Sequence, residues 1–394
     1  MEVTREVLIP AEEGAAVMEV NTCYRSPQGL GLLQQYSEVV GSDTFGRYFQ
    51  RSSEDNGRTW SQPRLIFRPR QTPQGMVRWG EGTLFLDEAR GTIIHWHNHD
   101  LYPADHYTGE VRTRTRILLQ VSGDGGESWT PARQLVQRGH DPEHWAEGVF
   151  VGRNCIAISF CAPITTRQGR VLLPAQLCPL GSDYSNSWLI KWEAGCFLGE
   201  WVGRRLEWER SQCVRIDPAL SSRGLCEPAL AELEDGRLLM VCRGSNYTMP
   251  QVPGYKWFAT SGDGGYSWSP PAPFTYADGR PFYSPATGSR LIRTRRGRLY
   301  WIGNITPDNP EGNRPRYPLQ IAQVDEGHLG LVPGSVRLIE DRQPGDPPAV
   351  QFSNFRVYED RETGDLLLAM ARIQERGEAD LSSPSYQYRL RLEA

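Results

Sequence analysis

The 394-residue chain lacks several patterns that would assign it to common functional classes. It has no run of 18 apolar residues, so we expect no membrane-spanning helix. Its formal net charge of −4 gives no basic excess of the kind that nucleic-acid-binding domains carry. We therefore expect neither a nucleic-acid nor a membrane partner. P-loop, nucleophile-elbow and dinucleotide-binding sequences are also missing, and we expect no cofactor.

Cysteine pairing is a second absence. None of the eight cysteines forms a Cys-x-x-Cys pair, which argues against zinc-finger and thioredoxin-like sites. The N-terminal sequence MEVTREVLIPAEEG contains acidic residues and no apolar core of a signal peptide. These features predict a cytoplasmic protein whose cysteines are free thiols.

Turn-forming and aromatic residues are plentiful: the chain has 40 Gly, 29 Pro, 16 Tyr and 12 Trp. This composition favours many short strands joined by turns. Few segments repeat their apolar residues with the 3.6-residue period of a helix, so we expect little helix.

One eight-residue pattern, Ser-x-Asp-x-Gly-x-x-Trp, occurs three times, at Ser53–Trp60, Ser122–Trp129 and Ser261–Trp268. The interval between the second and third copies is about twice the interval between the first and second. We therefore expect a degenerate copy near Glu193, in the sequence KWEAGCFL, and a further remnant around Asp325. A regular interval of this length predicts a repeat architecture.

The chemistry of this turn is structural. Its aspartate can accept backbone hydrogen bonds, its glycine can adopt a positive φ, and its tryptophan can pack between sheets. The acidic ligands of an EF-type calcium loop are missing. The turn resembles the Asp-box of the sialidase superfamily, whose members are six-bladed β-propellers. The resemblance implies an all-β fold of six four-stranded antiparallel blades, in one domain covering residues 1–394.

Most blades show a first hairpin of apolar strand, turn and apolar strand. We expect these hairpins at 81–99, 162–176, 227–243, 284–304 and 352–372, and from Arg25 to about Glu38 in the first blade. If the boxes mark one face of the propeller, the start of the first strand and the end of the second strand of each hairpin lie on the opposite face. The polar residues predicted there include Glu81, His97, His99, Asp100, Tyr283 and Asn304.

Several arginines also fall on that predicted face, and the guanidinium group binds carboxylates with two parallel hydrogen bonds. Sialidases hold a sugar carboxylate with three arginines, and the resemblance assigns these roles to Arg25, Arg243 and Arg316. Arg25 stands in a Tyr-Arg-Ser-Pro sequence, and Arg243 follows Glu227-Pro228 at the family spacing. Arg314 is the alternative to Arg316.

The resemblance also assigns the catalytic groups. Asp43 has the position of the acid/base aspartate, and Glu227 that of the glutamate that activates the nucleophile. The family nucleophile is a tyrosine, whereas the corresponding residue is identified here as Phe352. Phenylalanine cannot attack an anomeric carbon, so the standard retaining mechanism is excluded if Phe352 holds that position.

His95, His97 and His99 alternate and therefore share one face of a strand. Histidines at this spacing can chelate zinc, transfer protons near neutral pH, or simply pack inside the sheet. We expect no metal, and we retain His99 as a proton-transfer candidate and His97 as a substrate contact.

Three functions remain open. The first is an exo-acting glycoside hydrolase for a terminal acidic sugar, such as sialic acid or a related carboxylated sugar. In this hypothesis Asp43 is the general acid, and Glu227, or Glu81 with His99 and Asp100, activates water. The second is a polysaccharide lyase or related enzyme for uronate glycans that uses His99 or Tyr283. The third is a propeller that binds glycans without catalysis.

Overall fold

The computed structural model describes residues 1–392, and these residues form strands and turns without any helix. The chain is a six-bladed β-propeller of mostly four-stranded antiparallel sheets. None of the described residues lies in a helix that is long and apolar enough to cross a membrane. Contacts divide the chain into two compact units. Unit 1 comprises Met1–Thr108, Ile117–Arg133 and Asp341–Ala394, and unit 2 comprises Gly109–Arg116 and Gln134–Glu340.

Unit 1 contains blades 1, 2 and 6. Blade 1 is formed by β2 (Ala16–Tyr24), β3 (Leu32–Gly41), β4 (Thr44–Ser53) and β5 (Arg64–Phe67). Blade 2 is formed by β6 (Arg70–Thr72), β7 (Gly75–Asp87), β8 (Thr92–Tyr102), β9 (Arg116–Ser122) and β10 (Arg133–Gln134). Blade 6 is formed by β25 (Arg356–Glu359), β26 (Leu366–Ala371), β27 (Ser385–Arg391) and β1 (Glu2–Ile9).

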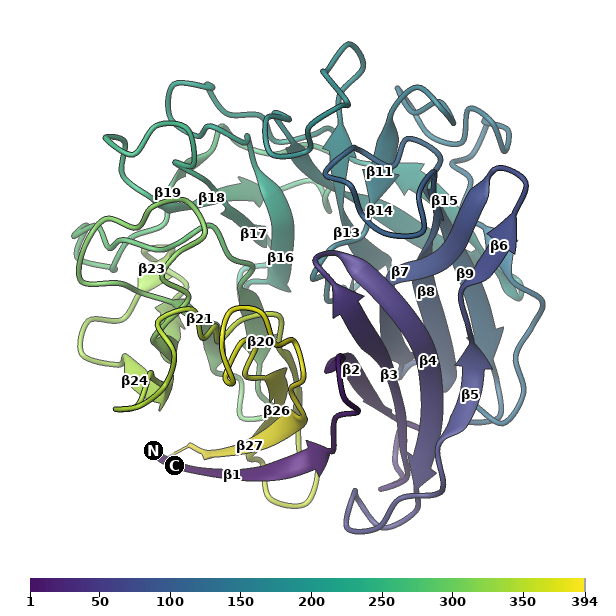
Figure 1. Cartoon of the computed structure of the whole chain (residues 1–394), viewed down its shortest axis with the longest axis horizontal. Helices are drawn as coiled ribbons and strands as arrows, with labels where there is room; N and C mark the ends of the chain where they lie inside the picture. The colour runs from purple at the N-terminus through teal and green to yellow at the C-terminus, as the bar shows by residue number, and fades with distance from the viewer. Residues whose placement is uncertain (393–394) are drawn as a thin grey trace. The chain divides into compact units, whose positions relative to one another are not determined.

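Blade 6 combines both ends of the chain. The N-terminal strand β1 pairs antiparallel with the C-terminal strand β27, from Glu2 opposite Arg391 to Ile9 opposite Ser385. Figure 1 shows these two strands side by side, with the two termini together. This pairing covers the edge that β27 would otherwise leave open to other chains.

Unit 2 contains blades 3, 4 and 5. Blade 3 is formed by β11 (Cys155–Ala157), β12 (Ile164–Thr165), β13 (Val171–Cys178), β14 (Glu193–Val202) and β15 (Arg205–Arg210). Blade 4 is formed by β16 (Cys226–Glu232), β17 (Leu238–Arg243), β18 (Lys256–Ser261) and β19 (Ala272–Pro273). Blade 5 is formed by β20 (Arg290–Arg293), β21 (Leu299–Asn304), β22 (Leu319–Asp325), β23 (Gly330–Leu331) and β24 (Arg337–Glu340).

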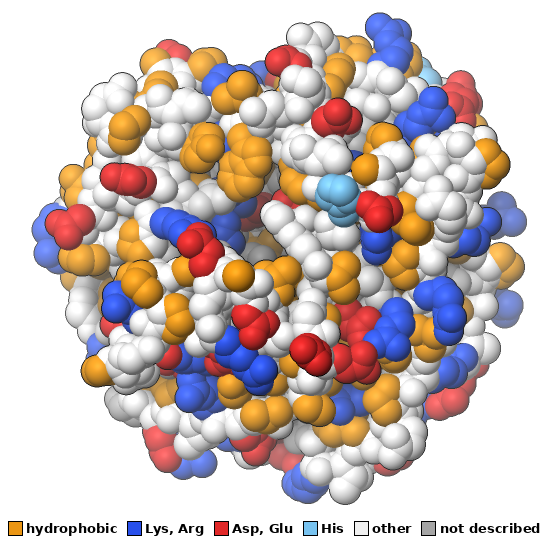
Figure 2. All heavy atoms as spheres, viewed as in Figure 1, with side chains coloured by type: hydrophobic (Ala, Val, Ile, Leu, Met, Phe, Trp, Pro, Cys, Tyr) orange, Lys and Arg blue, Asp and Glu red, His pale blue; other side chains and the backbone are white. Residues whose placement is uncertain are grey.

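Hydrophobic cores fill the space between neighbouring sheets of each unit. In unit 2, Leu239 and Val241 of β17 pack in one core with Trp301 of β21. Leu238 and Met240, on the opposite face of β17, pack in a second core. The strand is therefore apolar on both faces, as expected for a sheet buried between two others. On the face that Figure 2 draws, acidic and basic side chains are interspersed with apolar ones.

The three eight-residue patterns form the β4–β5 turn of blade 1, the β9–β10 turn of blade 2 and the β18–β19 turn of blade 4. In the first turn the Asp55 carboxylate accepts hydrogen bonds from the Thr59 backbone at 2.8 Å and the Thr59 hydroxyl at 2.7 Å. These bonds lower the pKa of Asp55 to about 2. Asp124 and Asp263 accept equivalent bonds from Ser128 and Ser267.

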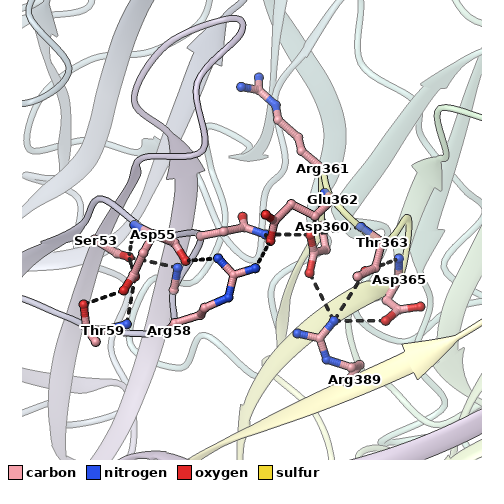
Figure 3. Close-up of polar contacts among 12 residues, drawn as sticks. Ser53, Asp55, Arg58, Thr59, Asp360, Arg361, Glu362, Thr363, Asp365 and Arg389 are labelled. Atoms are coloured by element: carbon pink, nitrogen blue, oxygen red, sulfur yellow. Dashed lines mark hydrogen bonds and ion pairs between the residues drawn. The ribbon is translucent and has the colours of Figure 1, made fainter.

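The first of these turns also binds the neighbouring blade of unit 1. Arg58 pairs with Glu362 in the turn between β25 and β26, and Asp360 and Asp365 of the same region pair with Arg389 at 3.1 and 2.9 Å (Figure 3). The box turns therefore stabilise the packing of one blade on the next.

Two sequence-based placements need correction. The first hairpin of blade 1 is β2–β3, so Arg25 lies in the turn of the hairpin and not at the start of its first strand. The expected degenerate box at Glu193 is wrong as well, because Glu193 begins strand β14, and the corresponding turn of blade 3 follows Val202. The other hairpins overlap the expected ranges, although β7–β8 extends beyond 81–99 at both ends, and β13 and β16 extend slightly beyond theirs. Asp325 does lie at the turn between β22 and β23 of blade 5.

Candidate functional site

Strands β2 of blade 1, β7 of blade 2 and β16 of blade 4 carry the same irregularity in their pairing. In blade 4, Cys226 lies opposite Arg243 and Ala229 opposite Val241, so three steps along β16 match two along β17. The same shift occurs between Met18 and Asn21 in β2 and between Trp79 and Gly82 in β7. One additional residue in a strand makes a β-bulge, which redirects the neighbouring side chains.

Two of these bulges hold a glutamate in the left-handed backbone region. Glu19 of blade 1 has a φ of 53°, and Glu227 of blade 4 has a φ of 49°. This conformation is uncommon for a residue with a side chain, and strained residues concentrate at functional sites. Each of the two glutamates is paired with an arginine. The bulge positions are therefore the natural starting points for the site.

In unit 2 the glutamate stands in a group with more positive than negative charge. We name Glu227, Arg243, Lys256 and Arg316 the basic cluster. Arg243 forms an ion pair with Glu227 through Nη1 and donates from Nη2 to Asn313 Oδ1 at 3.0 Å. Arg316 donates to the Asn313 carbonyl at 3.2 Å. Asn313 thus accepts hydrogen bonds from both guanidinium groups, one through its side chain and one through its backbone carbonyl.

Lys256 lies next to this arrangement and is completely buried, with 0% of its surface exposed. It faces Arg243 across the β17–β18 pair, and its ammonium donates to the carbonyls of Pro285 at 2.8 Å and Thr287 at 2.6 Å. Burial, followed by the nearby positive charge of Arg243, lowers its pKa to about 7. The charge of the basic cluster therefore changes near neutral pH.

In unit 1 the corresponding group is acidic. We name Glu19, Glu81 and Arg356 the acidic cluster. Arg356 Nη2 forms an ion pair with Glu19 and lies 3.7 Å from Glu81 Oε2, while its Nε donates to Asn21 Oδ1 at 3.0 Å. Arg356 and Glu19 are almost fully buried, whereas Glu81 is partly exposed. Two carboxylates share a single arginine here.

Arg25 does not lie where the sequence predicted. Its Nε donates to the Gly125 carbonyl at 2.8 Å, and its two Nη atoms form ion pairs with Glu54 and Glu127. Gly125, Glu54 and Glu127 all belong to box turns. The predicted role of Arg25 on the face opposite the boxes is therefore wrong, because the hairpin turn that carries it lies on the box side.

The residue of blade 6 that occupies the same bulge position as Glu227 is Asn354 and not Phe352. Regular pairing resumes with Ala229 opposite Val241 in blade 4 and begins with Arg356 opposite Ala369 in blade 6. Glu227 and Asn354 each lie two residues before that first regular pair, so the two positions correspond. Asn354 also has the left-handed φ of 58°. Phe352 is fully buried, with the Arg372 guanidinium 5.0 Å from its ring centroid, so the structure gives it no surface for a substrate. Neither residue is a tyrosine.

The alternating histidines do share one face of β8, and they pack inside unit 1. The His97 ring stacks on Trp79 with centroids 4.0 Å apart and is 0% exposed. Burial holds the pKa of His97 well below its usual value, and the neighbouring His95 and His99 lower it further. The substrate contact predicted for His97 therefore does not agree with its buried position.

The remaining predicted residues divide by exposure. Asp43 is exposed in the turn between β3 and β4, at the opposite end of blade 1 from its box, as predicted. His99, opposite Trp79, and Tyr283, stacked on Tyr255 at 6.1 Å, are partly buried.

Asp100 and Asn304, by contrast, are each 1% exposed. The Asn304 amide donates to the Pro318 carbonyl at 2.9 Å and accepts from the Thr287 hydroxyl at 3.0 Å. The ligand contact predicted for Asn304 therefore conflicts with its structural role, and that of Asp100 with its burial.

Sequence reasoning missed Glu19, Lys256 and Arg356. Glu19 lies just before the segment that was read as the first hairpin, and the left-handed φ that it shares with Glu227 has no motif of its own. Lys256 and Arg356 carry ordinary surface residue types, and only the fold buries them. Within residues 1–392 no group of three or more His, Cys, Asp or Glu side chains could hold a metal ion.

Solved structures that resemble this chain have the same fold at low sequence identity. A crystal structure of an unknown-function protein from Dyadobacter fermentans has a TM-score of 0.66 and 14% identity, covering 99% of both chains. The Hadza microbial sialidase Hz136 gives the same score and identity over 99% of this chain and 68% of its own. The GH93 α-L-arabinofuranosidase of Fusarium graminearum, solved with arabinobiose, has a TM-score of 0.59 and 12% identity, covering 98% of this chain and 97% of its own.

These structures establish the sialidase-like propeller architecture and not an activity. No curated protein matches the chain. The model of the BNR repeat-like domain matches residues 50–342, which include all three box turns and the basic cluster. The chain therefore belongs to the BNR repeat-like domain family.

Proposed function

We propose that the protein is an exo-acting glycoside hydrolase that binds the carboxylate of a terminal acidic sugar with Arg243 and Arg316. The observation that carries the proposal is the bridge through Asn313, which holds the two guanidinium groups together. Two fixed guanidinium groups suit a carboxylate because each presents parallel N–H donors. Glu227 neutralises only part of the positive charge of the basic cluster.

Glu227 is the proposed reacting carboxylate of unit 2. Its side chain forms an ion pair with Arg243, and a carboxylate in this position can accept a proton from water. In hydrolysis the water oxygen bonds to the anomeric carbon, the glycosidic C–O bond breaks, and the leaving oxygen takes a proton. Since neither Phe352 nor Asn354 can act as the tyrosine nucleophile, direct attack by water predicts inversion at the anomeric carbon.

The proton donor stays a prediction from the sequence. The sequence assigns this role to Asp43, which Asp43→Asn tests; Glu81 and His99, with Asp100, are the alternative to Glu227 for activating water, and Glu81→Gln and His99→Gln test that alternative. We expect the true donor variant to lose turnover most strongly on substrates with a poor leaving group, because these need protonation most.

The test of the proposal is a panel of 4-methylumbelliferyl glycosides of sialic, glucuronic and galacturonic acids, with an uncharged arabinofuranoside for comparison. We expect turnover of at least one acidic glycoside and its loss in Glu227→Gln and Arg243→Ala. Arg215→Ala is the matched control, because Arg215 is an exposed arginine paired with Glu193 in the same unit. Equal activity of Arg243→Ala and the parent on the acidic substrate would contradict the proposal.

A second candidate is a propeller that binds acidic glycans without cleaving them. The observation that favours it is the lack of a tyrosine at both Phe352 and Asn354. In this case calorimetry would detect binding of acidic sugars that Arg243→Ala removes, with no product from any glycoside. An unsaturated product detected by its ultraviolet absorbance would instead indicate a lyase.

A further inference from the structure

Next to the basic cluster, unit 2 presents an aromatic surface that the proposed chemistry does not use. Tyr247 is 51% exposed, and its ring centroid lies 5.5 Å from that of the partly buried Trp188. The guanidinium of Arg223 lies 4.5 Å from the Trp188 ring centroid. We name Trp188, Arg223 and Tyr247 the aromatic platform.

The aromatic platform belongs to the same end of the blades as the basic cluster. Trp188 lies in the loop between β13 and β14 of blade 3, and Tyr247 in the equivalent loop between β17 and β18 of blade 4. Arg316 lies in the equivalent loop of blade 5, and Arg223 immediately precedes blade 4. Because these connections all leave their blades opposite the box turns, the sequence-distant residues emerge on one side of unit 2.

Tyr247 packs against the loop that carries Asn313 and Arg316. Gly312 has a φ of 57°, and a β-carbon at this position would come within 3.0 Å of the Tyr247 ring. A larger residue at this position would press on the tyrosine, so the glycine permits the close approach of the loop. The next residue is Asn313, which holds Arg243 and Arg316. The short segment of Gly312 and Asn313 therefore lies between Tyr247 and the two arginines.

Hydrogen bonds from the side chain of Asn246 also fix this loop. Asn246 is buried and donates to the carbonyls of Pro310 at 2.7 Å and Val252 at 3.0 Å, while its Oδ1 accepts from the Gly312 backbone at 2.9 Å. These bonds hold the blade 4 and blade 5 loops together. A preorganised platform loses little conformational freedom when a ligand stacks on it.

We propose that the aromatic platform binds the second sugar of an acidic oligosaccharide whose terminal sugar carboxylate is held by Arg243 and Arg316. The proposal rests on the proposed function and adds a preference for substrates longer than one sugar. The apolar C–H face of a sugar packs against the half-exposed Tyr247 ring, since aromatic rings supply rigid contact area. Arg223 adds a positive charge beside this position, which favours an acidic glycan over a neutral one.

The test compares long and short ligands by calorimetry in the full chain. The probes are two matched pairs: sialyllactose with methyl sialoside, and trigalacturonate with methyl galacturonide. We expect Tyr247→Ala to weaken binding of the trisaccharide by about fivefold to tenfold, the loss expected for one aromatic contact. Binding of the corresponding methyl glycoside should stay unchanged. The Tyr247→Trp variant keeps an aromatic ring at this position and should bind the trisaccharide about as tightly as the parent.

The matched control is Tyr266→Ala. Tyr266 is 40% exposed, and the Arg170 guanidinium lies 4.9 Å from its ring centroid. Unlike Tyr247, it belongs to the box turn of blade 4. This control should change neither affinity. If Tyr247→Ala leaves trisaccharide binding unchanged, or weakens both ligands of a pair equally, the platform proposal is overturned while the proposed function stands. If the parent protein binds neither ligand of either pair, the proposed function fails and the platform proposal fails with it.

Discussion

Units 1 and 2 each place a glutamate–arginine pair at a bulge of a first blade strand, but the two pairs differ in charge and exposure. In the acidic cluster Arg356 serves two carboxylates, and the Glu19 side chain is only 3% exposed. In the basic cluster Arg243 serves one carboxylate, and Glu227 is 13% exposed. The same backbone irregularity thus supports a more buried pair in one unit and, in the other, a better exposed pair that we propose binds the ligand.

The largest difference should appear in stability when the arginine is removed. Arg356→Met removes the ion-pair partner of the buried Glu19, and breaking a buried pair from one side costs about 3–5 kcal/mol of unfolding free energy. Arg243→Met should cost less, because Glu227 can still reach water. Urea unfolding of the two variants measures this difference. An Arg356→Met variant as stable as Arg243→Met would remove the structural distinction between the clusters.

Ligand affinity should show the opposite order. Arg243→Met should weaken binding of the acidic sugar by about 100-fold, since a desolvated charged hydrogen bond is lost. Where Arg356→Met remains folded, its affinity should change far less. Calorimetry with the acidic sugar that the parent binds gives both values. A larger loss for Arg356→Met would place the ligand at the acidic cluster.

The pH dependence of binding sharpens the comparison further. Lys256 has a pKa lowered from 10.5 to about 7, so it is cationic below pH 7 and neutral above it. Affinity for an anionic ligand should therefore fall by roughly tenfold as the pH rises through 7, as expected for the loss of one nearby charge. Lys256→Gln should bind weakly at all pH values, with Lys256→Arg as the charged control. A parent profile that stays flat from pH 6 to 8 would contradict this role.

The smallest effect is expected away from both clusters, in a box turn. Asp124 has its pKa lowered to about 2 by hydrogen bonds from the Ser128 hydroxyl and backbone. Because this pKa lies below the unfolded value, the stabilisation is present above pH 4 and is lost as the pH falls towards 2. Asp124→Asn should lower Tm by a few degrees at pH 7, with ligand affinity unchanged. The Tm difference from the parent should shrink as the pH falls towards 2.

The fold was largely predictable because its signals are local. A box turn needs a serine, an aspartate and a glycine within a few residues, and the hydrogen bonds around Asp55 and Asp124 show why those types are required. The placement of Arg25 failed for a related reason. Its Tyr-Arg-Ser-Pro sequence resembles a strand start, whereas the strand had already run from Ala16 to Tyr24. Local likeness could not establish which end of the hairpin carried the arginine.

The sequence by itself determined the all-β repeat, the box turns, most of the first hairpins and the spacing of Glu227 from Arg243, because each depends on residues that are near in the chain. Only the tertiary structure decided which charges are buried and which meet. Asn313 joins Arg243 to Arg316, and Arg356 joins Glu19 to Glu81, through contacts between separate blades. Burial and charge pairing depend on such distant neighbours. For the same reason, the sequence predicted the site as a set of regularly spaced residues, whereas the structure contains two clusters of opposite charge.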